Sequence, residues 1–158
     1  MSNPTLDRLA ARLATAPTYP PAEGFGRDLT TVWTAQGPDL DSGFTEATGI
    51  DVLLQRLVRR ISTPHGSVAG CPNDCIDVRN YCGAGLSNAD AQAAQAQIAT
   101  ELERDQAVLP GVSVRMQYNA ATRGLTITIR GSSTLGPFSM TLAVGEVTVE
   151  LLNQSANG

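Results

Sequence analysis

Apolar and polar positions alternate at helical spacing most clearly over GIDVLLQRLVRRIS, residues 49–62. We expect Thr48 to cap the N-terminus of this helix and the Pro64 turn to end it. Its polar face holds Asp51 and Gln55 together with three arginines. The apolar face, which predicts burial against a core, consists of Ile50, Leu53, Leu54, Leu57, Val58 and Ile61.

A second long helix is predicted from Ser87 to about Gln106, because Asp90 follows Ser87 at capping-box spacing. Its apolar face is thin, so we expect close packing through alanine against a sheet or another helix. That face consists of Ala91, Ala94, Ile98 and Leu102.

From Val112 onward the apolar period changes from helical to two, which predicts β-strands over residues 112–118, 125–130 and 138–144. A turn at 119–124 makes the first two of these strands a hairpin. After Gly145 the apolar positions shift by one residue, so we expect a bulge or a bend into a separate final segment. The predicted fold class is α+β: two main helices packed on an antiparallel meander of about three strands.

The first 44 residues predict an extended arm that lies along a surface, either of its own chain or of a partner. Residues 5–15 have the spacing of a short helix, and the segment after them is rich in proline and glycine. Trp33, the single tryptophan, is expected to dock the arm on a surface. The predicted organisation is therefore an arm over 1–44, an α+β domain over 45–152 and a polar tail over 153–158.

Composition and charge narrow the classes of partner. The chain has 158 residues, enough for one domain with a core, and only 16% of them are charged. Its 11 basic residues are all arginine, and the net charge is −4, which argues against a nucleic-acid ligand. Neither a secretory leader nor an apolar run of bilayer length is evident, so we expect synthesis in a cytoplasm and no membrane insertion.

All three cysteines and the only histidine fall within residues 59–82. His65, Cys71, Cys75 and Cys82 could together ligate zinc, but their spacings do not match the common short-knuckle sites. A catalytic cysteine would have His65 as its sole candidate base. A disulfide between two of the three cysteines and simple reduced thiols are the other interpretations, and the sequence leaves them open.

The carboxylates indicate no active site. Glu46 and Asp51 flank a helix start, where acids complement the helix dipole. Asp74 and Asp77 lie in a turn, where they commonly cap backbone amides. The sequence also lacks a phosphate-binding glycine loop and a nucleophile elbow. We therefore expect a protein that is not an enzyme and needs no cofactor.

Several motifs, taken in order, resemble one family. FGRDL (25–29), PDLDSG (38–43), residues 49–68 and CPNDCIDVRNY (71–81) are similar to the small baseplate wedge protein of contractile-tailed phages, the tail-sheath initiator family. The resemblance covers roughly residues 24–151. The chain departs from the family pattern at His65, at all three cysteines and at 105–107. These departures favour a disulfide particular to this chain, in a particle that leaves the cell.

The resemblance implies a structural virion protein with a domain like the handshake part of the sheath subunit. Multiple copies around a six-fold baseplate would contact the tail sheath protein and the other wedge proteins, with the tail tube or hub proteins as further candidate partners. Assembly would occur in the host bacterial cytoplasm. A phage tail and a bacterial contractile injection system both fit these residues.

The mechanism that the resemblance implies is β-strand addition to an open sheet edge that nucleates the sheath. We place that edge on the strands at 125–130 and 138–144, whose wet face is rich in serine and threonine and lacks the lysines that guard exposed edges. Coverage of the sheet by the chain's own arm is the alternative. The expected sheath-binding residues are Thr126, Thr128, Arg130, Ser139, Thr141 and Ala143.

A second surface is expected to contact the baseplate. Arg56, Arg59 and Arg60 would meet neighbouring wedge proteins or acids of the chain's own arm, and Trp33 belongs to the same predicted interface. The family also carries an older lysozyme-like description, so a peptidoglycan-degrading tail enzyme is the alternative function. A zinc-stabilised interaction module is the third.

Overall fold

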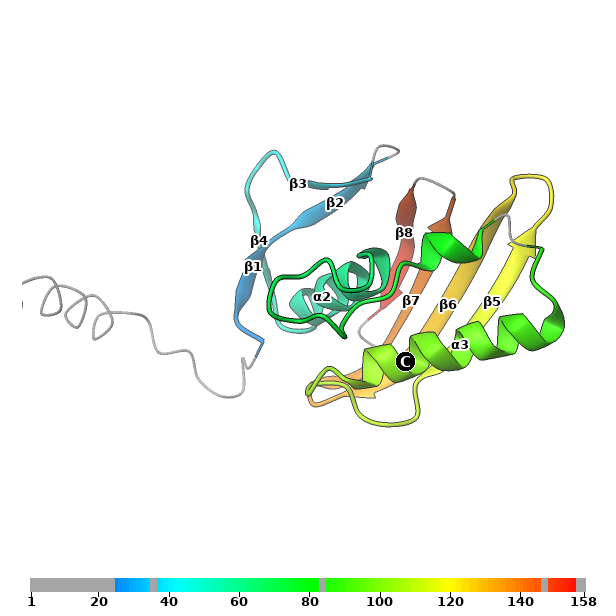
Figure 1. Cartoon of the computed structure of the whole chain (residues 1–158). Coiled ribbons are helices and arrows are strands. Elements are labelled where there is room, and N and C mark those ends of the chain that lie inside the picture. Colours follow the sequence, from blue (N-terminus) through cyan, green and yellow to red (C-terminus); the bar gives the residue numbers. More distant parts are fainter. Residues whose placement is uncertain (1–24, 35–36, 83–84, 146–147, 156–158) are drawn as a thin grey trace, which may run out of the picture.

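The computed structural model describes residues 25–34, 37–82, 85–145 and 148–155. The predicted short helix over residues 5–15 lies outside the described residues. Two α-helices and a four-stranded antiparallel sheet form the body, so the predicted α+β class is confirmed (Figure 1).

Both long helices form where the apolar spacing predicts them. Helix α2 spans Ile50–Ser62, but its N-cap is Gly49, with φ of 59° and no side-chain cap, so the prediction of Thr48 as the cap was wrong. Helix α3 spans Asn88–Glu103, and Ser87 forms the predicted capping box with Asp90. The Ser87 hydroxyl accepts from the Asp90 backbone N–H at 3.2 Å, and the Asp90 carboxylate accepts from the Ser87 backbone N–H at 3.3 Å. A short 3₁₀ helix, η2, spans Val78–Tyr81.

The main sheet has the order β5-β6-β7-β8, with each strand antiparallel to its neighbours. It has one strand more than the three or so predicted. Beyond Gly145 the chain turns back, with the Gly145 N–H donating to the Thr148 carbonyl at 2.8 Å. The separate final segment predicted there is therefore confirmed as β8. The strands are β5 Ser113–Asn119, β6 Gly124–Ser133, β7 Gly136–Val144 and β8 Val149–Ser155.

Part of the predicted arm forms two small antiparallel sheets. Strand β1, Arg27–Leu29, pairs with β4, Glu46–Thr48, directly before α2. Strands β2, Thr31–Thr34, and β3, Gly37–Leu40, pair with each other. Their hairpin contacts β8, so residues predicted as an arm lie against the body.

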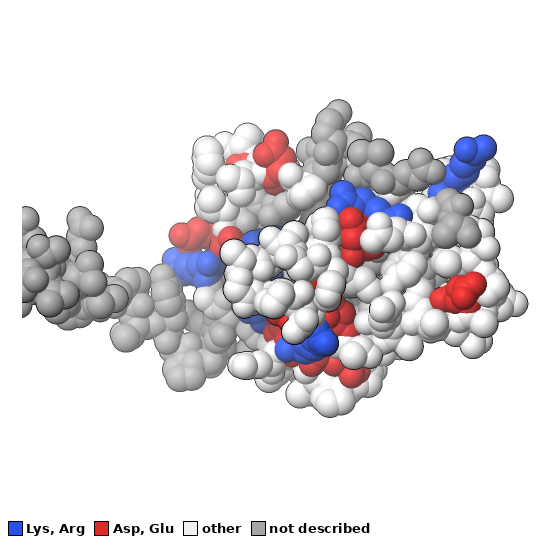
Figure 2. Space-filling model, viewed as in Figure 1, with Lys and Arg blue, Asp and Glu red and all other residues white. Residues whose placement is uncertain are grey.

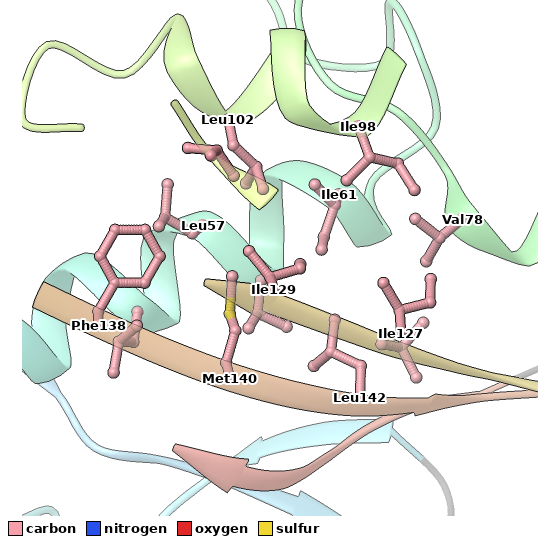
Figure 3. Close-up of a cluster of buried hydrophobic side chains, with 14 of the residues drawn as sticks. Leu57, Ile61, Val78, Ile98, Leu102, Ile127, Ile129, Phe138, Met140 and Leu142 are labelled. Atoms are coloured by element: carbon pink, nitrogen blue, oxygen red, sulfur yellow. The ribbon is translucent and has the colours of Figure 1, made fainter. Parts of the chain in front are cut away.

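The core lies between the two helices and one face of the main sheet (Figure 3). Leu57 and Ile61 of α2 and Ile98 and Leu102 of α3 point toward it and are fully buried. The alternating residues of β6 and β7 close it from below, as period-two burial requires. In the described part of the chain, neither α-helix packs on the opposite face of this sheet, and neither is long and apolar enough to cross a membrane. The core residues of these two strands are Leu125, Ile127, Ile129, Phe138, Met140, Leu142 and Val144.

Candidate functional site

The six residues predicted to form a sheath-binding edge do not lie on an edge. Thr126, Thr128 and Arg130 belong to β6, which pairs with β5 on one side and β7 on the other. The prediction used the polar side chains on one face of these strands to identify an open edge. An open edge, however, depends on which backbone groups remain unpaired, and the order of the strands decides this. The placement was therefore wrong. The same holds for the three residues on β7, which pairs with β6 and β8: Ser139, Thr141 and Ala143.

These six side chains do share one face, opposite the core. Across the ladder, Thr128 lies beside Thr141 and Arg130 beside Ser139. All are half-buried except Arg130, which is exposed. The serine- and threonine-rich wet face predicted from the sequence is therefore confirmed as a surface of side chains.

The edges of the main sheet are β5 and β8, and they differ in how they are protected. Strand β5 pairs with β6 over all seven of its residues without a shift in register. Its sequence, SVRMQYN, has one charge and no proline, glycine or lysine. Natural edges are usually guarded by such residues or by bulges. Strand β5 is thus a regular edge that lacks most of these devices.

Strand β8 is protected in two ways. Its register against β7 shifts so that Leu142 faces Leu151 while Thr141 faces Asn153, which leaves Leu152 as an extra, exposed residue. The β2–β3 hairpin also contacts this strand. A bulge and a covering hairpin both hinder pairing with another chain. Of the two edges, β5 is the better site for an added strand.

The three arginines of α2 bind acids of their own chain. Arg56 reaches Asp105 with its Nε 2.7 Å from Oδ2, and its guanidinium also stacks 5.6 Å from the Phe25 ring centre. Arg59 pairs with Asp28 of the arm. This contact matches the alternative that acids of the arm would meet these arginines. On the face in Figure 2, several basic side chains lie next to acidic ones, while a few charged groups stand alone.

Arg60 is the centre of a charge network in which Glu101 is buried and Arg60 half-buried. Its Nε lies 2.7 Å from Oε1 of Glu101, and its Nη2 lies 3.2 Å from Oδ2 of Asp74. Glu101 Oε1 also accepts from the Cys75 backbone N–H at 2.8 Å, while Oε2 lies 3.2 Å from Arg104 Nη1. The network joins α2, α3 and the 63–77 loop. These contacts give the α2 arginines structural roles. The side chain of Trp33, which was predicted to belong to the same baseplate interface, lies outside the described part of the structure.

The loop that carries the cysteines is therefore held in place by ion pairs and hydrogen bonds. Cys71 is exposed, Cys75 is buried and Cys82 is half-buried, and no disulfide joins any two of them in the structure. Cys82 Sγ donates to the Val144 carbonyl at 3.3 Å. The His65 ring contacts the Cys75 carbonyl through Nδ1 at 3.0 Å. Among the described residues, no group of three or more histidine, cysteine, aspartate or glutamate side chains is arranged to hold a metal ion.

Native labelling with iodoacetamide is expected to modify Cys71 at least about tenfold faster than Cys75. Burial raises the pKa of the Cys75 thiol, and the charges of Glu101 and Asp74 add to this effect against the opposing Arg60. Cys75 therefore holds less of the reactive thiolate and exposes less of it. Peptide mass spectrometry of the timed reaction measures both rates. Faster labelling of Cys75, or a Cys71–Cys75 disulfide in the non-reduced digest, would contradict this arrangement.

The carboxylates weighed as possible catalytic pairs are mostly engaged in ion pairs. Glu46 lies 2.9 Å from Arg27, and Asp74 contacts Arg60. Burial acts to raise the pKa of Asp77, but hydrogen bonds from Arg79 outweigh it, so this pKa lies below its ordinary value. A glycosidase general acid needs a shift in the opposite direction.

An open groove of about 470 Å³ runs between α3 and the segment formed by residues 65–81. Its lining includes Asp77 and Glu101, both of which form ion pairs with arginine. Tyr81 also lines it, and its hydroxyl donates to Gln97 Oε1 at 2.8 Å. These contacts engage Asp77, Glu101, Tyr81 and Gln97 within the structure.

Comparison with protein-family models and with curated proteins finds no match to this chain.

Proposed function

We propose that this chain is a structural baseplate protein of a contractile tail that joins the wedge to the sheath and starts sheath assembly. The observation that carries the proposal is the β5 edge, which is regular over seven residues. Support for the family comes from the order of motifs over residues 25–81 and from the α+β architecture that follows them. A handshake-like role of the main sheet and a virion location belong to the same proposal.

The physical basis is backbone pairing. About half of the backbone N–H and C=O groups of an edge strand point away from its single neighbour. An extended segment of a sheath subunit would pair with these groups on β5 and become a fifth strand. No cofactor or chemical step is needed, so the proposed protein is not an enzyme. Six-fold copies on the baseplate would present six such edges to the first sheath ring.

Edge β5 replaces the predicted β6 and β7 site in this proposal. Wedge contacts are expected away from Arg56, Arg59 and Arg60, because these side chains already bind Asp105, Asp28 and Glu101. The arm region around β2 and β3 is the more suitable baseplate contact, since Val32 and Leu40 are exposed apolar residues there.

A seeding assay tests this function. A candidate sheath protein from the same genome is polymerised with and without the purified full chain, and turbidity and electron microscopy follow the reaction. We expect this chain to shorten the lag before polymerisation and to lie at one end of each sheath. The chain with proline in β5 is the matched control and should not seed. Equal lag times with and without the chain would rule out nucleation, and clearing of purified cell walls would instead support the enzymatic alternative.

A further inference from the structure

The β5–β6 hairpin carries three arginines that form no ion pair with any carboxylate of the described residues. Residues 106–145 contain three arginines and no aspartate or glutamate, although the whole chain has a net charge of −4. Within the described residues, no carboxylate forms an ion pair with Arg115, Arg123 or Arg130. Every other arginine of the described part has an acidic partner: Arg27, Arg56, Arg59, Arg60, Arg79 and Arg104.

Two of the three unpaired arginines share the outer face at the β5 edge. Arg115 lies opposite Thr128, and Arg130 lies opposite Ser113, so the two arginines are diagonal neighbours across the ladder. Together with Gln117 they line a shallow hollow of about 260 Å³. Both arginine side chains are exposed. An acidic side chain placed beside β5 on this face would meet two uncompensated guanidinium groups.

The inner face of β5 has the opposite character. Val114 and Met116 are half-buried, and Tyr118 is 53% exposed although it points to the core side. A second hollow, of about 210 Å³, lies between this face and the start of α3. Apolar groups dominate its lining, which suits an apolar side chain. The lining includes Tyr81, Leu86, Ala91, Met116, Tyr118 and Leu125.

On the basis of the strand addition proposed above, we infer that the partner segment alternates apolar residues with aspartate or glutamate. A strand beside β5 sends successive side chains to opposite faces, so one set meets the apolar hollow and the other meets Arg115. Directly opposed opposite charges stabilise such a pair, and like charges destabilise it. The β5 edge would thus select an acidic, extended segment and reject a basic one.

Two labelled peptides test the inference with the full chain: capped Thr-Val-Glu-Val-Glu-Val-Glu-Val-Thr and its counterpart with lysine at each glutamate. We expect the glutamate peptide to bind about tenfold more tightly by fluorescence anisotropy. Arg115→Glu should reverse the preference, and Arg115→Gln should weaken the glutamate peptide about threefold. Arg123→Glu is the matched control, because it makes the same charge change in the hairpin turn, and it should alter affinity less than about twofold.

Amide chemical shifts of the ¹⁵N-labelled chain locate the bound peptide, and the expected changes lie along residues 113–119. Equal binding of both peptides at β5, unaffected by Arg115→Glu, would overturn the acidic preference and leave strand addition standing. If neither peptide shifted these amides, both the acidic preference and strand addition at β5 would be overturned. Light scattering that shows a dimer joined through β5 would make a second copy the occupant and would also overturn the inference.

Discussion

Replacing Glu101 with alanine is expected to lower the free energy of unfolding by about 2–3 kcal/mol, the largest effect of any single charge removal in this chain. The Glu101 side chain is only 8% exposed and holds Arg60, whose own side chain is 18% exposed. Alanine would remove the carboxylate 2.7 Å from Arg60 Nε, leaving Arg60 its weaker contact with Asp74 at 3.2 Å, and would leave the Cys75 backbone N–H without its acceptor. The 63–77 loop would lose its main attachment to α3. Urea unfolding followed by circular dichroism measures the change.

Arg104→Gln is the matched control for Glu101→Ala. Arg104 binds the same carboxylate at 3.2 Å, but its side chain is 47% exposed, so water screens the pair. We expect a loss below about 1 kcal/mol. If both variants lost the same free energy, Glu101 would be no more than a surface partner, and the loop would be held by other contacts.

Proline placed successively at Val114, Arg115, Met116 and Gln117 is expected to separate folding from assembly with a period of two. In an antiparallel edge strand, alternate backbone N–H groups point to the neighbour or outward. Proline at an inward position breaks a bond to β6 and should cost about 2–4 kcal/mol. Proline at an outward position keeps the fold but removes a donor that an added strand needs. Thermal unfolding and the sheath-seeding assay, run on all four variants, show at which positions the N–H points to β6 and at which it points outward.

Thr128→Pro and Thr141→Pro complete that comparison. Both residues lie on central strands, so an N–H lost at either position faces a neighbouring strand on one side or the other. We therefore expect both variants to be destabilised, in contrast to the β5 variants, of which only alternate ones should lose stability. Normal seeding by every stable β5 proline variant would contradict strand addition at this edge.

The spacing of apolar residues predicted the helices and strands of the body correctly, because this spacing shows which face of each element is buried. Five of the six apolar residues predicted for the inner face of α2 are buried and Ile50 is half-buried, and the alternating apolar residues of β6 and β7 are buried as well. The N-cap was wrong because Thr48 ends β4, leaving Gly49, with its positive φ, to start the helix. A local capping preference was overridden by strand pairing with the arm.

The order of strands in the sheet determines which strand has an open edge, and the side-chain composition of the strands does not show this order. The wet faces of β6 and β7 are indeed nearly uncharged, yet both strands are paired on each side. The recognisable signal was position in the meander: the first strand after the last helix has a sequence neighbour on one side only. The Arg60–Glu101 network could not be predicted from the sequence either, because Glu101 lies on a helix with so few apolar residues that their spacing does not show which side is buried.

Electron cryo-microscopy of the assembled particle at side-chain resolution tests the strand-addition account most directly. The account predicts a strand from a sheath subunit hydrogen-bonded along Ser113–Asn119, with an acidic side chain next to Arg115. A bare β5, or a β5 covered by residues of this same chain, would contradict it.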